Sequence, residues 1–256
     1  MGGNTKIITV ALNKGGTGKT TTVEALAIGL VSRGKKILSI DLDSQGNLSV
    51  TMGAKRSGLT IYDVLVNGCD INTAVQHTAN GDIIASSPML SNLDTILNRS
   101  TAKEYKLADA IESIAGQYDY ILIDTPPALG SELGNALTAS DYVILTAQPN
   151  SFSIDGIDMI YKSVILPVQK HTNKKLKIMG ILLTRCKKNT DLYKESRSQF
   201  EEIAAELNTE LFDTAISDSV HIQEIQSYGL DFFTKKKNTA ISDYKSFIDE
   251  FVERCL

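Results

Sequence analysis

The sequence predicts an α/β fold, with one domain over residues 1–256 in which helices flank a doubly wound, mostly parallel sheet. Short, almost wholly apolar runs of strand length recur along the chain, and stretches with helical periodicity separate them. Strands that alternate with helices in this way form sheets covered on both faces. No Pro/Gly/Ser-rich linker interrupts the alternation, so a second domain is not expected.

The elements can be followed in order from the N-terminal end. The first strand is expected at residues 7–12, an uncharged run that is apolar except for one threonine. A helix follows from Thr20, because apolar residues recur on one helical face as far as Val31, and Gly34 is a suitable C-terminal cap. Further strands are expected at residues 37–40, 83–85, 120–123, 142–145 and 178–183, and helices near residues 103–115, 153–166 and 191–207. Ligands bind beyond the carboxyl ends of strands in such sheets, which predicts a functional edge after Leu12, Ile40, Ile123 and Leu183.

A glycine-rich loop, Asn13 to Thr21, joins the first strand to the first helix and is the strongest functional signal. Its glycines let the backbone wrap closely around a phosphate chain, and the helix directs its positive dipole end at the same place. In a phosphate loop Lys19 would bridge the β and γ phosphates, and the Thr20 hydroxyl would coordinate magnesium. The loop departs from G-x-x-x-x-G-K-[ST], because Asn13 holds the first glycine position and Lys14 adds a second lysine. The predicted nucleotide contacts are Lys14, Gly15, Gly16, Thr17, Gly18, Lys19, Thr20 and Thr21.

Four further segments accompany this loop: residues 41–47 (DLDSQGN), 121–127 (ILIDTPP), 135–141 (NALTASD) and 227–229 (SYG). With the Lys14 loop, these boxes resemble those of the ParA/Soj branch of the ParA/MinD, or deviant Walker A, superfamily of P-loop NTPases. That branch comprises the chromosome- and plasmid-partitioning ATPases. Ser44 stands where the D-x-D-P-Q-G-N box of the branch has proline. The resemblance runs from about Lys6 to the last helix.

The resemblance implies an ATPase that uses ATP and Mg²⁺. Asp43 is then the residue expected to orient the attacking water, with Asp41 nearer the magnesium. Asp124 ends a hydrophobic strand on the same edge as the loop, where a carboxylate can hold the magnesium shell together with Thr20. The resemblance also implies that Lys14 reaches across a dimer to the phosphates of the partner subunit. Lys14, Lys19 and Asp43 are therefore the predicted catalytic residues, and ATP is expected to drive a monomer to a homodimer.

The resemblance extends to the base pocket and to partners. By family position, Thr184, Arg185 and the loop after Ile216 lie near the adenine. Members of the branch bind double-stranded DNA non-specifically as ATP dimers and are stimulated by a ParB-type centromere-binding protein. The predicted DNA contacts are Lys187, Lys188, Lys235 and Lys236, and the C-terminal third also offers Lys174, Lys175 and Lys177. Two arginines that Soj-type relatives place in this half are replaced by Asn189 and Asp218.

Composition limits the other classes of function. The formal net charge of −4 argues against a protein that is basic all over. The cysteines, Cys69, Cys186 and Cys255, form no C-x-x-C pair, which favours reduced thiols and argues against a shared Fe–S cluster. We therefore expect a cytoplasmic protein, associated with the nucleoid if DNA binding holds. A metabolic or redox P-loop enzyme of the same superfamily stays an alternative. A MinD-like positioning ATPase is another, but acidic residues accompany the apolar stripe of residues 247–256, so we expect this segment to dock on the core and not on a membrane.

Overall fold

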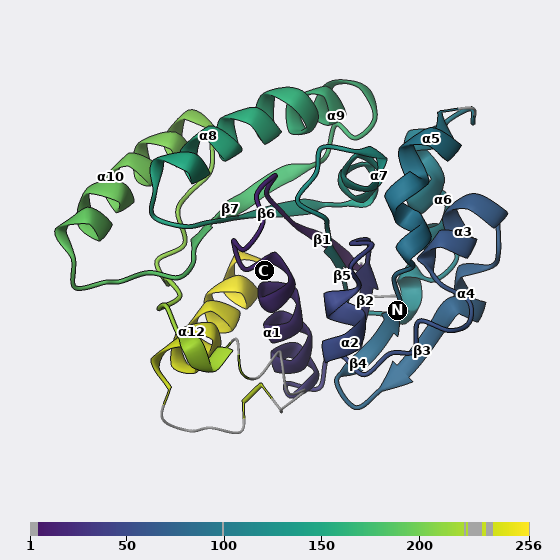
Figure 1. Ribbon diagram of the computed structural model, residues 1–256, viewed down its shortest axis with the longest axis horizontal. Helices are drawn as coiled ribbons and strands as arrows, with labels where there is room; N and C mark the ends of the chain where they lie inside the picture. The colour runs from purple at the N-terminus through teal and green to yellow at the C-terminus, as the bar shows by residue number, and fades with distance from the viewer. Residues whose placement is uncertain (1–4, 99, 223, 225–231, 234–237, 256) are drawn as a thin grey trace.

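The central sheet has the predicted mostly parallel, doubly wound form. The computed structural model describes residues 5–98, 100–222, 224, 232–233 and 238–255 (Figure 1). Within them the strands are β1 (Lys6–Ala11), β2 (Ile37–Asp41), β3 (Val75–Thr78), β4 (Gly81–Ile84), β5 (Tyr120–Asp124), β6 (Tyr142–Ala147) and β7 (Lys177–Leu183). Their spatial order is β3-β4-β2-β5-β1-β6-β7, and all neighbours are parallel except β3 and β4. The predicted fold class is confirmed.

Helices cover both faces of this sheet (Figure 1). They are α1 (Lys19–Val31), α2 (Asn47–Thr51), α3 (Ile61–Asn67), α4 (Ile71–Ala74), α5 (Leu93–Leu97), α6 (Lys106–Glu112), α7 (Ser131–Ala139), α8 (Ser151–Ile160), α9 (Leu166–His171), α10 (Asp191–Glu206) and α12 (Thr239–Arg254). Buried residues of α1, α2 and α12 share one apolar cluster on one face. Those of α3 and of α5 to α10 fill two clusters on the other face.

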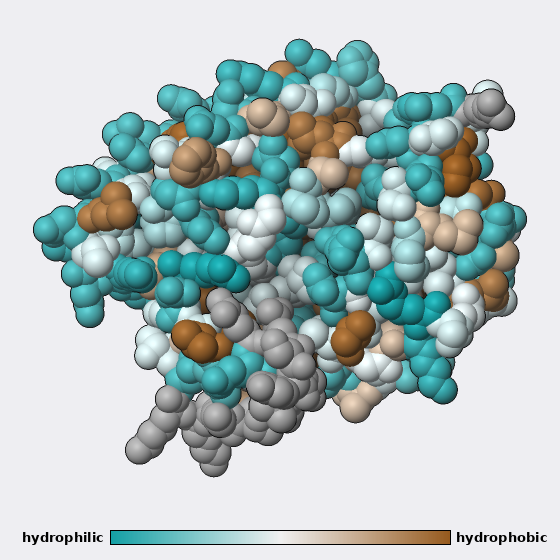
Figure 2. Space-filling model, viewed as in Figure 1, coloured by the Kyte–Doolittle hydropathy of each residue, from teal (hydrophilic) through white to brown (hydrophobic). Residues whose placement is uncertain are grey.

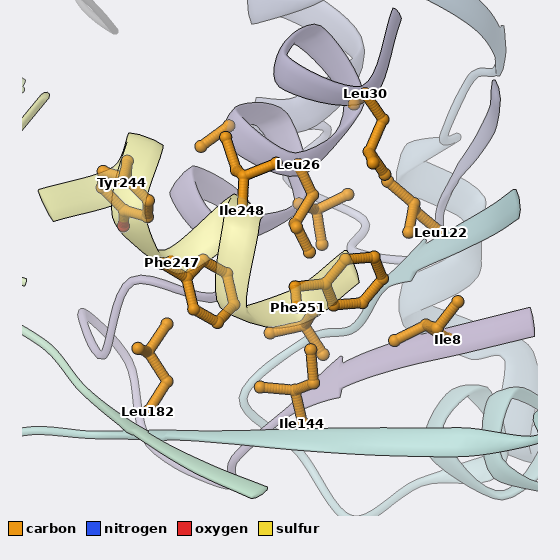
Figure 3. Packing of buried hydrophobic residues seen from close by; sticks show 14 of the residues in the cluster. Ile8, Leu26, Leu30, Leu122, Ile144, Leu182, Tyr244, Phe247, Ile248 and Phe251 are labelled. Carbon is orange, nitrogen blue, oxygen red and sulfur yellow. The ribbon is translucent and has the colours of Figure 1, made fainter. Parts of the chain in front are cut away.

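Side chains of successive strand residues enter opposite clusters. Ile8 and Val10 of β1 belong to the cluster under α1, whereas Ala11 belongs to the cluster under α7 and α8. This two-residue alternation with both faces buried explains why the strands read as continuous apolar runs. Figure 3 shows neighbouring strands meeting α1 and α12 through Ile8, Leu122, Ile144, Leu182, Leu26, Leu30, Phe247, Ile248 and Phe251.

The C-terminal helix docks on the core, as the sequence predicts. Phe247, Ile248 and Phe251 of α12 are buried against α1 and the sheet. A Cβ on Gly29 of α1 would collide with the Ile248 side chain, so this glycine permits the close approach of the two helices. None of the described helices is long and apolar enough to cross a membrane. On the face shown in Figure 2, hydrophobic side chains are scattered among hydrophilic ones.

Some elements differ from the sequence prediction. The edge strand β3 was not predicted, because its residues Val-Gln-His-Thr are mostly polar and only half-buried. The helix expected at residues 153–166 starts at Ser151 and continues through a π-helical turn at Tyr161–Ile165 to His171, past Pro167. Proline lacks an N–H and its ring crowds the preceding turn, and the wider π turn accommodates both effects.

Candidate active site

The phosphate loop lies between β1 and the N-terminus of α1. Gly16 and Gly18 have φ angles of +76° and +84°, in the left-handed region that favours glycine. Gly18 is the N-cap of α1, and no side chain caps this end. An uncapped helix N-terminus behind a glycine-rich turn is suited to a phosphate group.

Side chains from β6 and from the segments that follow β6 and β7 hold the loop in place. The Thr184 hydroxyl donates to the carbonyl of Thr17 at 2.8 Å, and the Gln148 amide donates to the carbonyl of Gly16 at 2.8 Å. The Thr17 and Thr146 hydroxyls lie 3.2 Å apart. A pocket of about 610 Å³ opens over the loop, lined by residues 15–21 together with Asp43, Gln45 and Arg185. The sheet therefore supports the loop from behind and leaves its outer side open.

Lys19 places a buried cation beside this pocket. The residue is only 6% exposed, and its Nζ donates to the carbonyl of Lys14 at 2.9 Å. Burial lowers the pKa of Lys19, against the attraction of Asp124 and Asp43, which raises it. A triphosphate in the pocket would favour the charged form of this lysine.

Two buried carboxylates face each other behind the loop. Asp41 and Asp124 are register partners at the ends of β2 and β5. Asp124 Oδ2 accepts a 2.7 Å hydrogen bond from the Thr20 hydroxyl, and its Oδ1 is buried with no hydrogen-bond partner. Asp41 Oδ2 accepts from both the amide and the hydroxyl of Ser49, at 2.8 and 2.7 Å. The predicted metal residues Thr20, Asp41 and Asp124 are thus brought together.

This cluster fits a magnesium ion bound with nucleotide. Burial raises the pKa of Asp124 well above its ordinary value, and the neighbouring charge of Asp41 adds to the shift. Burial also raises the pKa of Asp41, to about 6, although its hydrogen bonds from Ser49 oppose the shift. No group of three or more His, Cys, Asp or Glu side chains in the described part of the chain could hold a metal by itself. Mg²⁺ usually takes one or two carboxylates and completes its shell with phosphate and water, so the orphaned Asp124 oxygen and the Thr20 hydroxyl suit it.

Asp43 lies nearer the pocket than Asp41 does. It is 9% exposed and lines the pocket, and its Oδ1 accepts a 2.9 Å hydrogen bond from the amide of Gln45. Asp41 instead turns toward Ser49 and accepts from the amide of Asp43 at 3.1 Å. The chain leaves the strand between these two residues, and the two carboxylates therefore have different surroundings.

The residues expected near adenine lie together at one end of the phosphate loop. Thr184 and Arg185 line a small pocket with Gly18, Thr21 and the segment from Ile216 to Ser219. The amide of Cys186 donates to the carbonyl of Ile216 at 2.8 Å, which ties the two segments to each other. Sequence reasoning missed Tyr244 of α12, which also lines this pocket, because no local motif marks a residue that distant in the chain.

The side chain of Lys14 lies beside the N-terminal end of α8. Its Nζ donates to the Asn150 side chain at 3.2 Å and lies 5.1 Å from the centroid of the Phe152 ring. Phe152 is 72% exposed. Lys14 therefore contacts Asn150 and Phe152 and is only half-buried, whereas Lys19 is buried beside the pocket.

The candidate DNA contacts have different surroundings. Lys187 is exposed, whereas Lys188 forms a 2.8 Å ion pair with Asp243 of α12. The exposed Lys174, Lys175 and Lys177 lie at the amino end of β7, on the edge of the sheet opposite the phosphate loop. Lys235, Lys236 and the box at residues 227–229 lie outside the described residues.

We expect Asp124→Asn to stabilise the nucleotide-free protein in EDTA at about pH 8. The folded-state pKa of Asp124 is raised, so the wild type loses stability as pH rises above the ordinary carboxyl range. The asparagine variant lacks this loss, and its advantage should shrink as pH falls toward about 5. Thermal unfolding across this range measures the difference, with the exposed Asp191→Asn as the control. A wild type more stable than Asp124→Asn at pH 8 would contradict the expectation.

Comparison with known proteins identifies the family. A family profile described as an AAA domain matches residues 5–178. The chain is 35% identical over 228 residues to the sporulation initiation inhibitor protein Soj of Bacillus subtilis, with 88% of each protein covered. It is 33% identical over 230 residues to the chromosome partitioning protein ParA of Caulobacter vibrioides, covering 88% of this chain and 85% of that protein. Among solved structures it is similar to a cobyrinic acid a,c-diamide synthase from Mycobacterium smegmatis with bound ATP analog and magnesium. The TM-score is 0.84 and the sequence identity 26%, and the match covers 98% of this chain and 96% of the synthase chain. Identity at this level over most of both chains shows that the protein belongs to the ParA/Soj family of partitioning ATPases, as its sequence boxes indicate.

Proposed function

We propose that this chain binds Mg-ATP at the Asn13–Thr21 loop and uses ATP hydrolysis to switch between a monomer and a DNA-binding dimer in plasmid or chromosome partitioning. The observation that carries the proposal is the orphaned Asp124 oxygen beside the Thr20 hydroxyl, directly behind a phosphate loop. The bound ATP analog and magnesium of the synthase structure support the same ligands here. A ParB-type centromere-binding protein is the proposed stimulating partner.

Each residue of the site has a role in this proposal. The loop amides and Lys19 hold the phosphates, and Thr20, Asp41 and Asp124 hold the magnesium shell. When bound, magnesium neutralises charge on the phosphate oxygens. Asp43 orients the attacking water, because it lines the pocket and its carboxylate is directed by the amide of Gln45. In phosphoryl transfer the protein mainly positions groups, so a misplaced carboxylate slows turnover more than it weakens binding.

We expect Asp43→Ala to bind Mg-ATP with an affinity close to that of the wild type and to hydrolyse it on the order of 100-fold more slowly. Equilibrium binding of a fluorescent ATP analogue and steady-state phosphate release measure the two effects separately. Asp191→Ala, at an exposed position on α10, is the matched control and should turn over normally. Wild-type turnover in Asp43→Ala would remove this residue from the mechanism.

The proposed role of Lys14 is to contact the phosphates of the partner subunit. Its contacts with Asn150 and with the exposed ring of Phe152 support a role outside its own pocket. A cation supplied in trans makes dimerisation depend on γ-phosphate occupancy, much as an arginine finger does. Hydrolysis would then remove the charge that Lys14 recognises and release the dimer.

We expect Lys14→Ala to bind ATP yet remain monomeric at protein concentrations where the parent dimerises. The comparison is made in the Asp43→Ala background, so that hydrolysis does not reverse the switch, and sedimentation velocity with ATP gives the oligomeric state. Lys35→Ala, an exposed lysine just beyond the C-terminal end of α1, controls for loss of positive charge. Unimpaired dimerisation of Lys14→Ala would count against the role in trans.

DNA binding is proposed to depend on backbone phosphates and not on base sequence. Lys187 is exposed at the carboxyl edge of the sheet, close in sequence to Thr184 and Arg185 of the nucleotide site. Lys188 is half-buried and paired with Asp243, which reduces its availability to DNA. Lys187 is therefore the better candidate of the two.

We expect Lys187→Ala to weaken binding of the ATP-bound protein equally for unrelated duplexes and to reduce the salt slope by about one. Fluorescence anisotropy over a salt series measures both quantities. Lys174→Ala, at the opposite edge of the sheet, should leave the slope unchanged. An association that is undetectable or insensitive to salt would eliminate the DNA-binding proposal.

A metabolic enzyme is the second candidate, favoured by the similarity to the synthase structure. A synthase requires a second substrate, whereas a partitioning ATPase turns over ATP without one. Phosphate release measured alone and with added DNA separates the two classes.

A further inference from the structure

A tight turn presents Asp43 to the pocket. The amide of Gly46 donates to the carbonyl of Asp43 at 2.8 Å, which closes a four-residue turn over residues 43–46. The amide of Gln45 also donates to Asp43 Oδ1 at 2.9 Å, so the direction of the carboxylate depends on the same turn. Ser44 occupies the second position of the turn, where proline would fix the backbone and where the turn uses no N–H. Because this chain has serine at position 44, no proline ring restricts the backbone of the turn.

Arg56 forms hydrogen bonds to this turn from outside the pocket. It lies between α2 and α3 and donates through Nη2 to the carbonyl of Ser44 at 2.6 Å and through Nη1 to the carbonyl of Gln45 at 2.8 Å. Gly46 has a φ of +71°, and a Cβ there would collide with the guanidinium carbon. The guanidinium therefore packs directly against the backbone of the turn, and the glycine leaves room for it.

The same arginine links the turn to the buried carboxylates. Its Nε lies 3.4 Å from the carbonyl of Ser86, just beyond the end of β4. The Ser86 hydroxyl donates to the carbonyl of Asp43, and the Ser86 amide donates to the Ser49 hydroxyl at 2.9 Å. The Ser49 hydroxyl in turn donates to Asp41 at 2.7 Å. Arg56 is thus the outermost member of a hydrogen-bonded chain that reaches both aspartates of the box.

We propose that Arg56 is a positioning residue for ATP hydrolysis. It holds the 43–46 turn rigid and so directs the Asp43 carboxylate. A proline at position 44 would otherwise provide this rigidity. The proposal rests on the proposed function, because it assumes that Asp43 acts in hydrolysis. The described residues include no carboxylate paired with Arg56, and its hydrogen-bond partners are main-chain carbonyls. A planar fork can span adjacent carbonyls in a fixed geometry, which a lysine ammonium cannot do.

The test compares Arg56→Ala, Ser44→Pro and the double variant. Arg56→Ala should lower kcat by about 10- to 100-fold. The Kd for Mg-ATP should stay within about threefold, because the phosphate loop itself is not altered. Ser44→Pro alone should be close to wild type, and adding it to Arg56→Ala should restore most of the lost kcat. Arg33→Ala, which removes an arginine bound to a backbone carbonyl and to Asp249 at the far end of α1, is the matched control.

Each outcome decides the proposal. An unchanged kcat in Arg56→Ala overturns it, and so does a loss of kcat that Ser44→Pro fails to rescue, since the defect then lies outside the turn. If Arg56→Ala does not fold by circular dichroism, Arg56→Lys replaces it, because lysine keeps the charge and stem while losing the fork. The same rescue by Ser44→Pro is then required.

Asp43→Ala is assayed in parallel. Wild-type turnover there overturns the proposed role of Asp43, whereas an inactive Asp43→Ala with a fully active Arg56→Ala overturns only the role of Arg56.

Discussion

The site depends on the close placement of two buried carboxylates, Asp41 and Asp124, which the register of β2 with β5 brings together. Burial raises the pKa of both groups, so their charged forms are unfavourable without a cation between protein and phosphate. The surrounding hydrogen bonds satisfy Asp41 but leave one oxygen of Asp124 without a partner. The two buried carboxylates lack enough positive charge nearby to offset their own, so binding of a ligand that supplies positive charge stabilises the folded state.

The rest of the fold keeps this unfavourable arrangement in place. The strands that end at the two aspartates are buried on both faces, and α1 is held against them by the aromatic side chains of α12. The phosphate loop is fixed at Thr17 and Gly16 by Thr146 of β6, by Gln148 just after β6 and by Thr184 just after β7. Elements far apart in the sequence, α1 and α12, therefore pack in one cluster behind the site.

The local motifs were predictable from sequence, because a phosphate loop and strand-end carboxylates are defined by short-range spacing. Lys19, Thr20 and Asp43 line one pocket, and Asp41 and Asp124 are paired behind it by the parallel register of β2 with β5. Contacts between distant segments were not predictable in the same way. No local pattern marks Tyr244 at the small pocket or Gln148 behind the loop, and the ion pair of Lys188 with Asp243 depends on where α12 packs. The half-exposed strand β3 and the π turn before Pro167 also lack a clear periodic signal.

The turn at residues 43–46 shows how such a distant contact can substitute for a local one. A proline acts through the covalent restriction of its own φ angle, and its effect is present before the chain folds. A guanidinium that binds the carbonyls of Ser44 and Gln45 acts only after α2 and the following segment have folded beside the turn. The same rigidity then becomes a property of tertiary structure, and it is sensitive to any movement of the segment that bears Arg56. A catalytic carboxylate held in this manner is coupled to its surroundings, whereas one held by proline is largely independent of them.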